Sequence, residues 1–365
     1  MTRPDGVRVF GAPGRYLQGP DALNALGHLA APYGASPLVI GDAQVLDMLG
    51  ARLATNLAEA DLAPVFGTLK GEITREAIAD LAELGKTKEV CLVIGVGGGK
   101  SLDAAKGVAM LLGMPMFTVP TIASNDSPTS AAVAIYDDNH AMVAVDRMAR
   151  NPEVVLVDTA LIAKAPVAFL RAGIGDALAK KFEAEGCRAG RGTTPFGTRP
   201  LNTANAIADA CYRALRAHAE AALAACARNE VTDDLEAVVE AAVLMSGLGF
   251  ENGGLSLAHA LTRGLMRARG TRDAAHGDQV AWGLLVHLTA EGRGDDEIGE
   301  LIGFYRRIGL PSRLAELGMS EPGDEDIAQI VDWTLTAPHL KNFASPLDRP
   351  AIEAAIRRAE ALAVQ

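Results

Sequence analysis

The chain has 365 residues, of which 49% are hydrophobic and 22% charged, a balance typical of a globular protein of about two domains. Its net charge of −11 argues against nucleic acid as a partner, because phosphate binding needs a basic surface and no dense Lys/Arg run occurs. No apolar stretch is long enough to span a membrane, and the N-terminus lacks the apolar core of a signal peptide. We therefore expect a cytoplasmic protein with no membrane partner. Its four cysteines, which lack C-x-x-C spacing, are expected to be reduced: Cys91, Cys187, Cys211 and Cys226.

Up to about residue 160, short β-rich runs alternate with helical patterns. The runs are almost continuously apolar, as in parallel strands buried on both faces, and cover residues 36–42, 62–69, 89–98, 115–121 and 153–159. Residues 132–145 indicate an antiparallel hairpin that turns at 137–140. This alternation predicts an α/β domain with an open, mostly parallel, Rossmann-like sheet.

After residue 160 the strand signals almost disappear. Long helical patterns take their place, over residues 159–186, 202–229, 233–250 and 254–270. We predict an α/β domain over residues 1–163 and an all-α domain over residues 164–365, with the active site in the cleft between them.

The sequence "GVGGGKSLDAAK", which begins at Gly95, places four glycines between a predicted strand and a predicted helix. It is not a P-loop, because Ile94 stands where the first P-loop glycine belongs, and Lys100 occupies the third glycine position of the dinucleotide fingerprint. Glycines still allow a ligand close to the backbone, and a helix starting near Ser101, with Asp103 in its first turn, would offer free N–H groups to an anion. We predict a pyrophosphate site here; a tight glycine turn without a ligand is the alternative.

A second polar loop, residues 119–131, follows the next strand. Its hydroxyls and its carboxylate suit hydrogen bonds to ribose and phosphate, although a Ser/Thr-rich turn without a ligand is the alternative. Its polar residues are Thr121, Ser124, Asn125, Asp126, Ser127, Thr129 and Ser130.

Among the seven histidines, His259 and His276 lie in mostly apolar helical sequence, and Asp176 lies on a third predicted helix. One carboxylate and two imidazoles form the ligand set of an open catalytic zinc site, which keeps one position for water or substrate. Core or surface histidines without a metal are the alternative, because sequence separation does not show that the three residues converge.

Six motifs together carry a family resemblance. In chain order they are "GVGGGKSLDAAK", "VPTIASNDSPTSAAVAIY", "NPEVVLVDT", "GIGDALAKKFEA", "MSGLGFENGGLSLAHA" and "HGDQVAWG". The chain resembles the glycerol dehydrogenase branch of the iron-containing (group III) alcohol dehydrogenases over nearly its full length, and Lys-Ser after the glycine triplet is typical of that branch. The resemblance implies an NAD-dependent enzyme that oxidises a small polyol or vicinal diol to the ketone, and a homo-oligomer, in some relatives an octamer.

The resemblance also implies roles for individual residues. Asp176, His259 and His276 match the metal ligands, normally zinc; iron-type relatives carry an extra histidine where this chain has Lys180, so Zn²⁺ is expected rather than Fe²⁺. A metal of this kind would polarise the bound alcohol, while the cofactor accepts the hydride. Asp126 matches a residue close to nicotinamide and substrate, and completes the predicted catalytic set.

The remaining assignments concern the cofactor and the substrate pocket. Asp42 matches the acidic residue that binds the adenosine ribose, where a carboxylate favours NAD over NADP. Phe250 and Thr262 are assigned to the substrate pocket. The other predicted cofactor contacts are Gly97, Gly98, Lys100, Ser101, Asp103, Thr121, Ser124, Ser130, Ala132 and Tyr136.

Three positions depart from the branch pattern. Thr262, which precedes Arg263, and Lys341 stand where histidines are common, and Lys180 adds a cation beside Asp176. These side chains are compatible with pointing to solvent. If two cations face the cleft, they favour an anionic substrate such as a 2-oxo or 2-hydroxy acid. A dehydroquinate-synthase-like lyase lacks support, because the dense basic set it needs is not found, and a non-catalytic binding protein would not need the complete ligand set.

Overall fold

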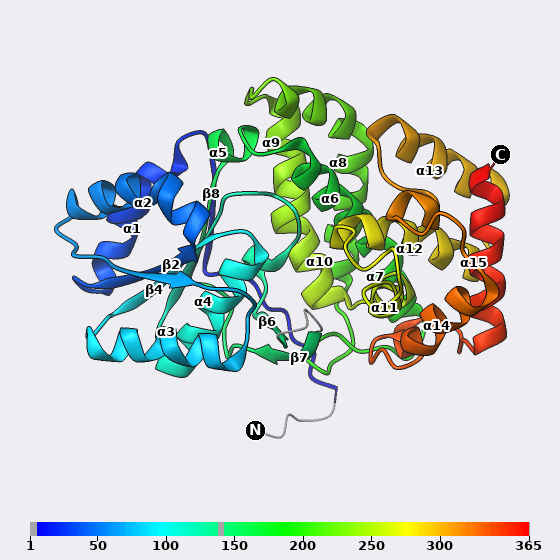
Figure 1. The fold of residues 1–365 in the computed structure, drawn as a ribbon, viewed down its shortest axis with the longest axis horizontal. Helices are drawn as coiled ribbons and strands as arrows, with labels where there is room; N and C mark the ends of the chain where they lie inside the picture. Colours follow the sequence, from blue (N-terminus) through cyan, green and yellow to red (C-terminus); the bar gives the residue numbers. More distant parts are fainter. Residues whose placement is uncertain (1–5, 138–141, 365) are drawn as a thin grey trace.

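The computed structural model describes residues 6–137 and 142–364. An α/β part built around one sheet and a helical part lie side by side (Figure 1). The α/β part ends with the strand whose last residue is Asp158, and the described residues beyond it form helices and loops only. The predicted fold class is confirmed, whereas the domain boundary after residue 163 stays a prediction.

All six strands of the main sheet are parallel, in the order β1-β8-β5-β4-β2-β3. Neighbouring strands are in register, with Val39 opposite Ile94 and Ile94 opposite Phe117. The strands are β1 (Arg15–Gly19), β2 (Pro37–Asp42), β3 (Val65–Leu69), β4 (Leu92–Gly97), β5 (Met116–Pro120) and β8 (Val154–Asp158). Five of them lie within the apolar runs of the sequence.

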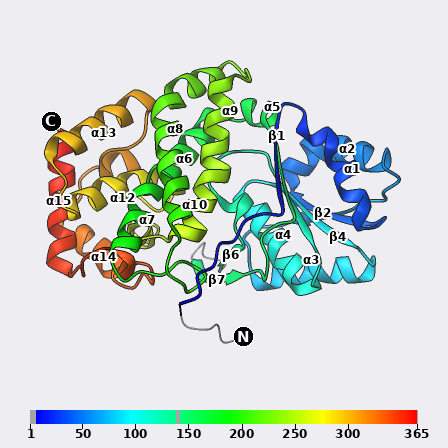
Figure 2. The same cartoon turned by 180° about the vertical axis from the view of Figure 1, so that it is seen from behind.

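The edge strand β1 was not predicted. Its sequence, RYLQG, lacks an apolar run, and none of its residues is fully buried. It pairs with β8, Arg15 opposite Val154, and follows an N-terminal segment that runs along the boundary between the two parts (Figure 2). Within that segment, Gly11 N donates to Asn252 Oδ1 at 2.7 Å and Asn252 Nδ2 donates to Gly11 O at 2.8 Å, which fastens it to the helical part.

Successive residues of the central strands point to opposite faces of the sheet. Val39 packs in one apolar cluster with Leu53, whereas Leu38 and Ile40 pack in another with Ile78. Both faces are therefore covered, which explains the continuous apolar runs. The covering helices are α1 (Leu26–Ala30) and α2 (Ala43–Ala58) on one face, and α3 (Arg75–Thr87) and α4 (Gly99–Leu112) on the other.

The predicted hairpin is present as β6 (Ala132–Tyr136) paired antiparallel with β7 (Met142–Arg147). Asp137 is the first residue of its predicted turn; the other three lie outside the described residues. Short 3₁₀ turns occur at Ala22–Ala25, Ala31–Tyr33, Ser127–Thr129, Leu314–Leu317 and Leu340–Asn342.

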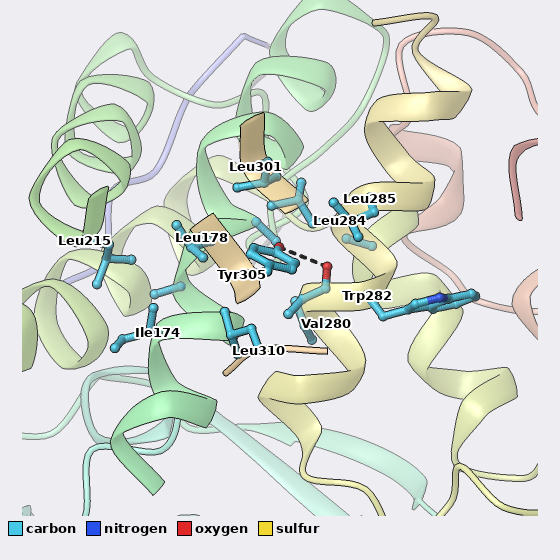
Figure 3. Close-up of a cluster of buried hydrophobic side chains, with 14 of the residues drawn as sticks. Ile174, Leu178, Leu215, Val280, Trp282, Leu284, Leu285, Leu301, Tyr305 and Leu310 are labelled. Carbon is cyan, nitrogen blue, oxygen red and sulfur yellow. Dashed lines mark hydrogen bonds between the residues drawn. The ribbon is translucent and has the colours of Figure 1, made fainter. Parts of the chain in front are cut away.

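The helical part surrounds its own apolar core, in which Trp282 and Tyr305 are the largest buried side chains (Figure 3). The Tyr305 hydroxyl donates to Ala281 O at 3.0 Å, so burying this polar group leaves no unpaired donor. The helices are α5 (Thr159–Ala163), α6 (Val167–Leu178), α7 (Lys180–Ala189), α8 (Asn202–Ala227), α9 (Asp233–Glu240), α10 (Ser246–Gly253), α11 (Leu257–Leu265), α12 (His276–Ala290), α13 (Asp295–Ile308), α14 (Asp324–Thr334) and α15 (Arg349–Val364), with a π-helical turn at Ala241–Met245.

All four cysteines are free, as predicted. Across residues 6–137 and 142–364, no helix combines the length and the hydrophobicity needed to cross a bilayer.

Helix α6 makes unusually close backbone contacts through its glycines. A Cβ atom on Gly277 of α12 would lie 1.7 Å from Ala172 O, and one on Gly175 would lie 2.5 Å from Gly277 O. On the opposite side, a Cβ on Gly173 would lie 2.0 Å from Ala123 O. Only glycine allows this packing, which fixes α6 between α12 and a loop of the sheet.

Replacing Gly277 with alanine should therefore destabilise the protein, because the new methyl group meets backbone that cannot rotate away. We expect Gly277→Ala to lower the free energy of unfolding by about 1–3 kcal/mol or more. The matched control is Gly299→Ala, in the exposed interior of α13, where a Cβ would meet no atom within 4 Å and should stabilise by roughly 0.5–1 kcal/mol. Urea unfolding measures both; equal midpoints for the two variants would contradict the close-packing argument.

Candidate active site

A cavity of about 600 Å³ lies between the sheet and the helical part. Lys100, Ser130 and Tyr136 line it from the sheet side, and Asp176 and His276 line it from the helical side. This volume is within the range of small-molecule sites, which often lie where two structural parts meet. The predicted cleft is therefore present and has walls from both parts.

Most residues predicted to touch cofactor, metal or substrate lie on the cavity wall. They are Lys100, Asp103, Asp126, Ser130, Ala132, Tyr136, Asp176, Phe250, His259, Thr262 and His276. The others lie at or just beyond the carboxyl ends of β2, β4 and β5, outside the wall that the described residues form: Asp42, Gly97, Gly98, Ser101, Thr121 and Ser124.

The glycine loop joins β4 to α4. The helix begins at Gly99, two residues earlier than predicted, because Gly98 already serves as its N-cap; Asp103 is therefore not in its first turn. A Cβ on Gly98 would lie 2.9 Å from Ile122 Cδ1, and one on Gly99 would lie 2.8 Å from Asn125 Nδ2. These glycines thus bring the start of α4 close to side chains of the polar loop that follows β5, whether or not a ligand binds.

Asp103 lines the cavity, but its carboxylate is bonded within the protein. It accepts hydrogen bonds from Lys106 Nζ at 2.9 Å, Ser127 Oγ at 2.5 Å and Ala134 N at 3.0 Å. Lys106, which sequence reasoning missed, is fully buried and also donates to Ser127 O at 2.6 Å and Ala132 O at 3.0 Å. This pair fastens the polar loop and β6 to α4. Lys100, by contrast, is largely exposed and pairs with Glu72.

The three predicted metal ligands converge from three helices. Asp176 comes from α6, His259 from α11, and His276 is the first residue of α12; their ligand atoms all lie within 4.8 Å of one another. Asp176 Oδ1 lies 3.0 Å from His259 Nε2 and 3.9 Å from His276 Nε2. The convergence that sequence separation left open is therefore present.

Glu183 of α7, which sequence reasoning missed, orients His259. Its Oε2 lies 2.5 Å from His259 Nδ1, and its Oε1 accepts from the backbone N–H groups of Ser256 at 2.7 Å and His259 at 3.0 Å. A carboxylate partner fixes the proton on Nδ1, so the lone pair of Nε2 faces Asp176. The sequence contained a signal for this role, because Glu183 follows Asp176 by two helical turns within the motif "GIGDALAKKFEA".

Lys180 does not point to solvent. Its side chain is about 1% exposed, and its Nζ lies 2.7 Å from Asp176 Oδ1, 2.9 Å from His259 Nε2 and 3.1 Å from Asp126 Oδ2. The same ammonium is 5.9 Å from the centre of the Phe250 ring. A cation therefore stands at the centre of the predicted catalytic set.

These buried charges shift one another's pKa values. Burial alone would raise the pKa of Asp176, but Lys180 and the two histidines hold it well below its usual value. Burial would lower the pKa of Lys180, but Asp126 and Asp176 raise it above the usual value. The pKa of Glu183 falls to about 2 because His259 outweighs the effect of burial. These shifts favour an ammonium at Lys180 and a carboxylate at Asp176.

The residues do not fit a metal ion while Lys180 holds this position. The donor types are suitable for zinc, and the Glu183–His259 pair has the form of the outer-sphere contact that metal-bound histidines make. However, a metal would bind through the lone pairs of Asp176 Oδ1 and His259 Nε2, and the Lys180 ammonium already contacts both atoms. Two cations sharing the same two donors would repel each other.

The other two departures from the family pattern also lie at the cavity. The Thr262 hydroxyl donates to His259 O at 2.8 Å, and Lys341 lines the cavity while remaining exposed. His339, which sequence reasoning missed, also lines the cavity, and its buried Nε2 has no hydrogen-bond partner among the residues that the structure describes. Burial, followed by the charge of His259, lowers the pKa of His339 to about 4.

Comparison with known proteins shows the family to which the chain belongs. The family model of the iron-containing alcohol dehydrogenases matches residues 13–159. A glycolaldehyde reductase of Halobacterium salinarum is 38% identical over 324 residues, covering 89% of each chain. The chain belongs to the iron-containing alcohol dehydrogenase family. A glycerol dehydrogenase of Thermotoga maritima is 40% identical over 322 residues, covering 88% of this chain and 87% of that protein.

The fold agrees with this assignment. The crystal structure of a probable glycerol dehydrogenase from Sinorhizobium meliloti has a TM-score of 0.92 at 34% identity and covers 98% of this chain and 99% of its own. The resemblance to the glycerol dehydrogenase branch is therefore confirmed, and the chain is an oxidoreductase of the alcohol dehydrogenase class.

Because the Glu183 carboxylate is stabilised in the fold, its contribution to stability should depend on pH. The folded pKa is about 2, below the ordinary value of 4.5, so the stabilisation is complete above the ordinary pKa and is lost as pH falls through the folded one. We expect Glu183→Gln to lower the free energy of unfolding by about 1–3 kcal/mol at neutral pH. The difference in the free energy of unfolding between Glu183→Gln and the wild type should become smaller at acidic pH.

Urea unfolding at several pH values measures this effect. Glu185→Gln is the matched control, because Glu185 is on the same helix but is only half-buried and pairs with Lys181. A destabilisation of Glu183→Gln that stays constant down to the lowest pH would show that charge is not its source.

Proposed function

We propose that the chain is an NAD-dependent dehydrogenase that oxidises a small polyol or vicinal diol, such as glycerol, to the ketone. The observation that carries this proposal is the cavity, whose wall is formed by the polar loop after β5, which includes Asp126, together with Asp176, Lys180 and the two imidazoles. The names of the relatives, glycerol dehydrogenase and glycolaldehyde reductase, support a small hydroxylated substrate. The carbinol hydride passes to the nicotinamide, and the hydroxyl proton leaves to solvent.

The sheet part supports the cofactor proposal. The N-terminus of α4 at Gly98 and Gly99 offers free N–H groups for a pyrophosphate beyond the carboxyl ends of the strands. Asp42, at the end of β2, accepts a hydrogen bond from Val45 N at 2.9 Å and lies 3.3 Å from Ser101 Oγ. A carboxylate in this place favours the ribose of NAD over the phosphorylated ribose of NADP. On this proposal residues 1–163 bind the cofactor and residues 164–365 carry the catalytic groups.

The charges in the cavity favour a neutral substrate. The Lys180 ammonium is balanced by Asp126 and Asp176, so it does not add a free positive charge for an anion. The alternative, a dehydrogenase of a 2-hydroxy acid or another anionic alcohol, rests on Lys341 at the cavity wall. The resemblance favours zinc over iron as the metal. Zinc binding remains a hypothesis, because it requires Lys180 to move away from Asp176 and His259. A cytoplasmic homo-oligomer likewise remains a prediction.

The test is NADH formation, followed by absorbance, with glycerol, 1,2-propanediol, 2-hydroxy acids and phosphorylated diols, each with and without added zinc. We expect turnover of the neutral diols. Turnover of the anionic alcohols alone would replace the leading substrate class by the alternative, and no NADH from any alcohol would contradict the proposal.

Removing the charge of Asp42 should relax the preference for NAD. Asp42→Asn keeps a side chain that caps α2 well, so stability should hardly change, but it removes the repulsion of a 2′-phosphate. We expect the KM for NADP to fall several-fold relative to the KM for NAD. Asp47→Asn, an exposed position on the same helix, is the control. An unchanged ratio of the two KM values would show that Asp42 does not face the adenosine ribose.

A further inference from the structure

Three elements bring their polar groups to a single atom, Lys180 Nζ. The ammonium donates to Asp176 Oδ1 at 2.7 Å and contacts His259 Nε2 at 2.9 Å, and Asp126 Oδ2 lies 3.1 Å away. The side chain is buried in the protein, and Lys180 is one of the residues that line the cavity. The surrounding residues therefore fix the position of this ammonium, unlike that of a lysine on the surface.

The arrangement around it requires a cation. Because Glu183 holds the proton of His259 on Nδ1, the lone pair of Nε2 and the carboxylate oxygen of Asp176 face each other at 3.0 Å. Two electron-rich atoms at this distance repel unless a positive group binds both. A divalent metal is one such group. In this chain the Lys180 ammonium already contacts both atoms.

We propose that the Lys180 ammonium takes the place of the catalytic metal, so that this enzyme transfers hydride without a bound divalent ion. The inference rests on the proposed dehydrogenase function and names the group that stabilises the substrate oxygen in it. Lys180 is then a catalytic residue, and Asp176 and His259 are its positioning residues.

The reaction balances with the ammonium unchanged. In the reducing direction a hydride moves from NADH to the carbonyl carbon, the π pair of the C=O bond moves to oxygen, and that oxygen takes a proton from water. Bonds to Asp176 and His259 use two of the three N–H groups of Lys180. The third is on the side of Asp126 Oδ2, 3.1 Å from Nζ, and the substrate oxygen shares this N–H with Asp126 or takes its place. Oxidation of the alcohol is the reverse.

The first measurement is the metal content of the purified wild-type protein, together with a calorimetric titration with Zn²⁺. We expect substoichiometric metal, no high-affinity zinc binding, and turnover that a chelator does not reduce. One equivalent of tightly bound zinc, with activity lost on chelation, would overturn the inference while leaving the dehydrogenase function intact.

Variants at position 180 test whether the Lys180 ammonium is what excludes the metal. Lys180→Ala frees Asp176 Oδ1 and His259 Nε2, and Lys180→His adds a third imidazole; both should gain binding of one Zn²⁺ and, with Co²⁺, the visible absorption of a nitrogen- and oxygen-ligated ion. Without added metal, Lys180→Ala should lose about 10²-fold or more in kcat, as expected when a donor to a developing oxyanion is removed. Lys181→Ala is the matched control, since Lys181 pairs with Glu185 and Asp209 instead, and it should resemble wild type in each readout.

The outcomes separate this inference from the proposed function. The metal measurements need no substrate, so absence of turnover on every alcohol would contradict the dehydrogenase function alone. If the two Lys180 variants fold, as judged by circular dichroism, and bind no more Zn²⁺ or Co²⁺ than wild type does, the ammonium is not what excludes the metal and the inference fails. If Lys180→Ala does not fold, Lys180→His, which retains a polar side chain at the site, decides in the same way.

Discussion

The close backbone contacts of helix α6 determine where the chemistry of this protein is located. Gly173 lies against the loop after β5 and Gly175 lies against the start of α12, and neither position has room for a side chain. Asp176 follows directly, so its carboxylate is placed between the sheet and His276 to within the tolerance of backbone packing. The distance between the sheet side and the helical side of the cavity is therefore set by backbone packing.

The buried charges form one interdependent group. Asp176, Asp126 and Glu183 are costly to remove from water unless polar partners accompany them; the Lys180 ammonium contacts the first two, and His259 Nδ1 pairs with Glu183. Each member has at least one partner within the group, so the loss of one leaves another charge unpaired. Such a group holds its geometry firmly, which suits a site that must orient a hydride donor and acceptor.

The sequence predicted the parts of the structure that depend on hydrophobic pattern. The buried strands appeared as continuous apolar runs, while the edge strand β1 had no such run and was missed. Pattern also located Asp176, His259 and His276, but it could not give the direction of Lys180, because a charged side chain normally extends to solvent. The spacing of four residues from Asp176 indicated a shared helical face. Only the packing of α11 and of the Asp126 loop around that face shows that Lys180 is enclosed.

The N-terminal segment has a consequence for how the chain is made. β1 is synthesised before its partner strand β8, and Gly11 bonds to Asn252, 241 positions further along. These contacts cannot form until both partners have been synthesised, and pairings between distant residues are slow to close. The edge of the sheet therefore cannot close before β8 has been made, and the later contact with Asn252 also ties the sheet to the helical part.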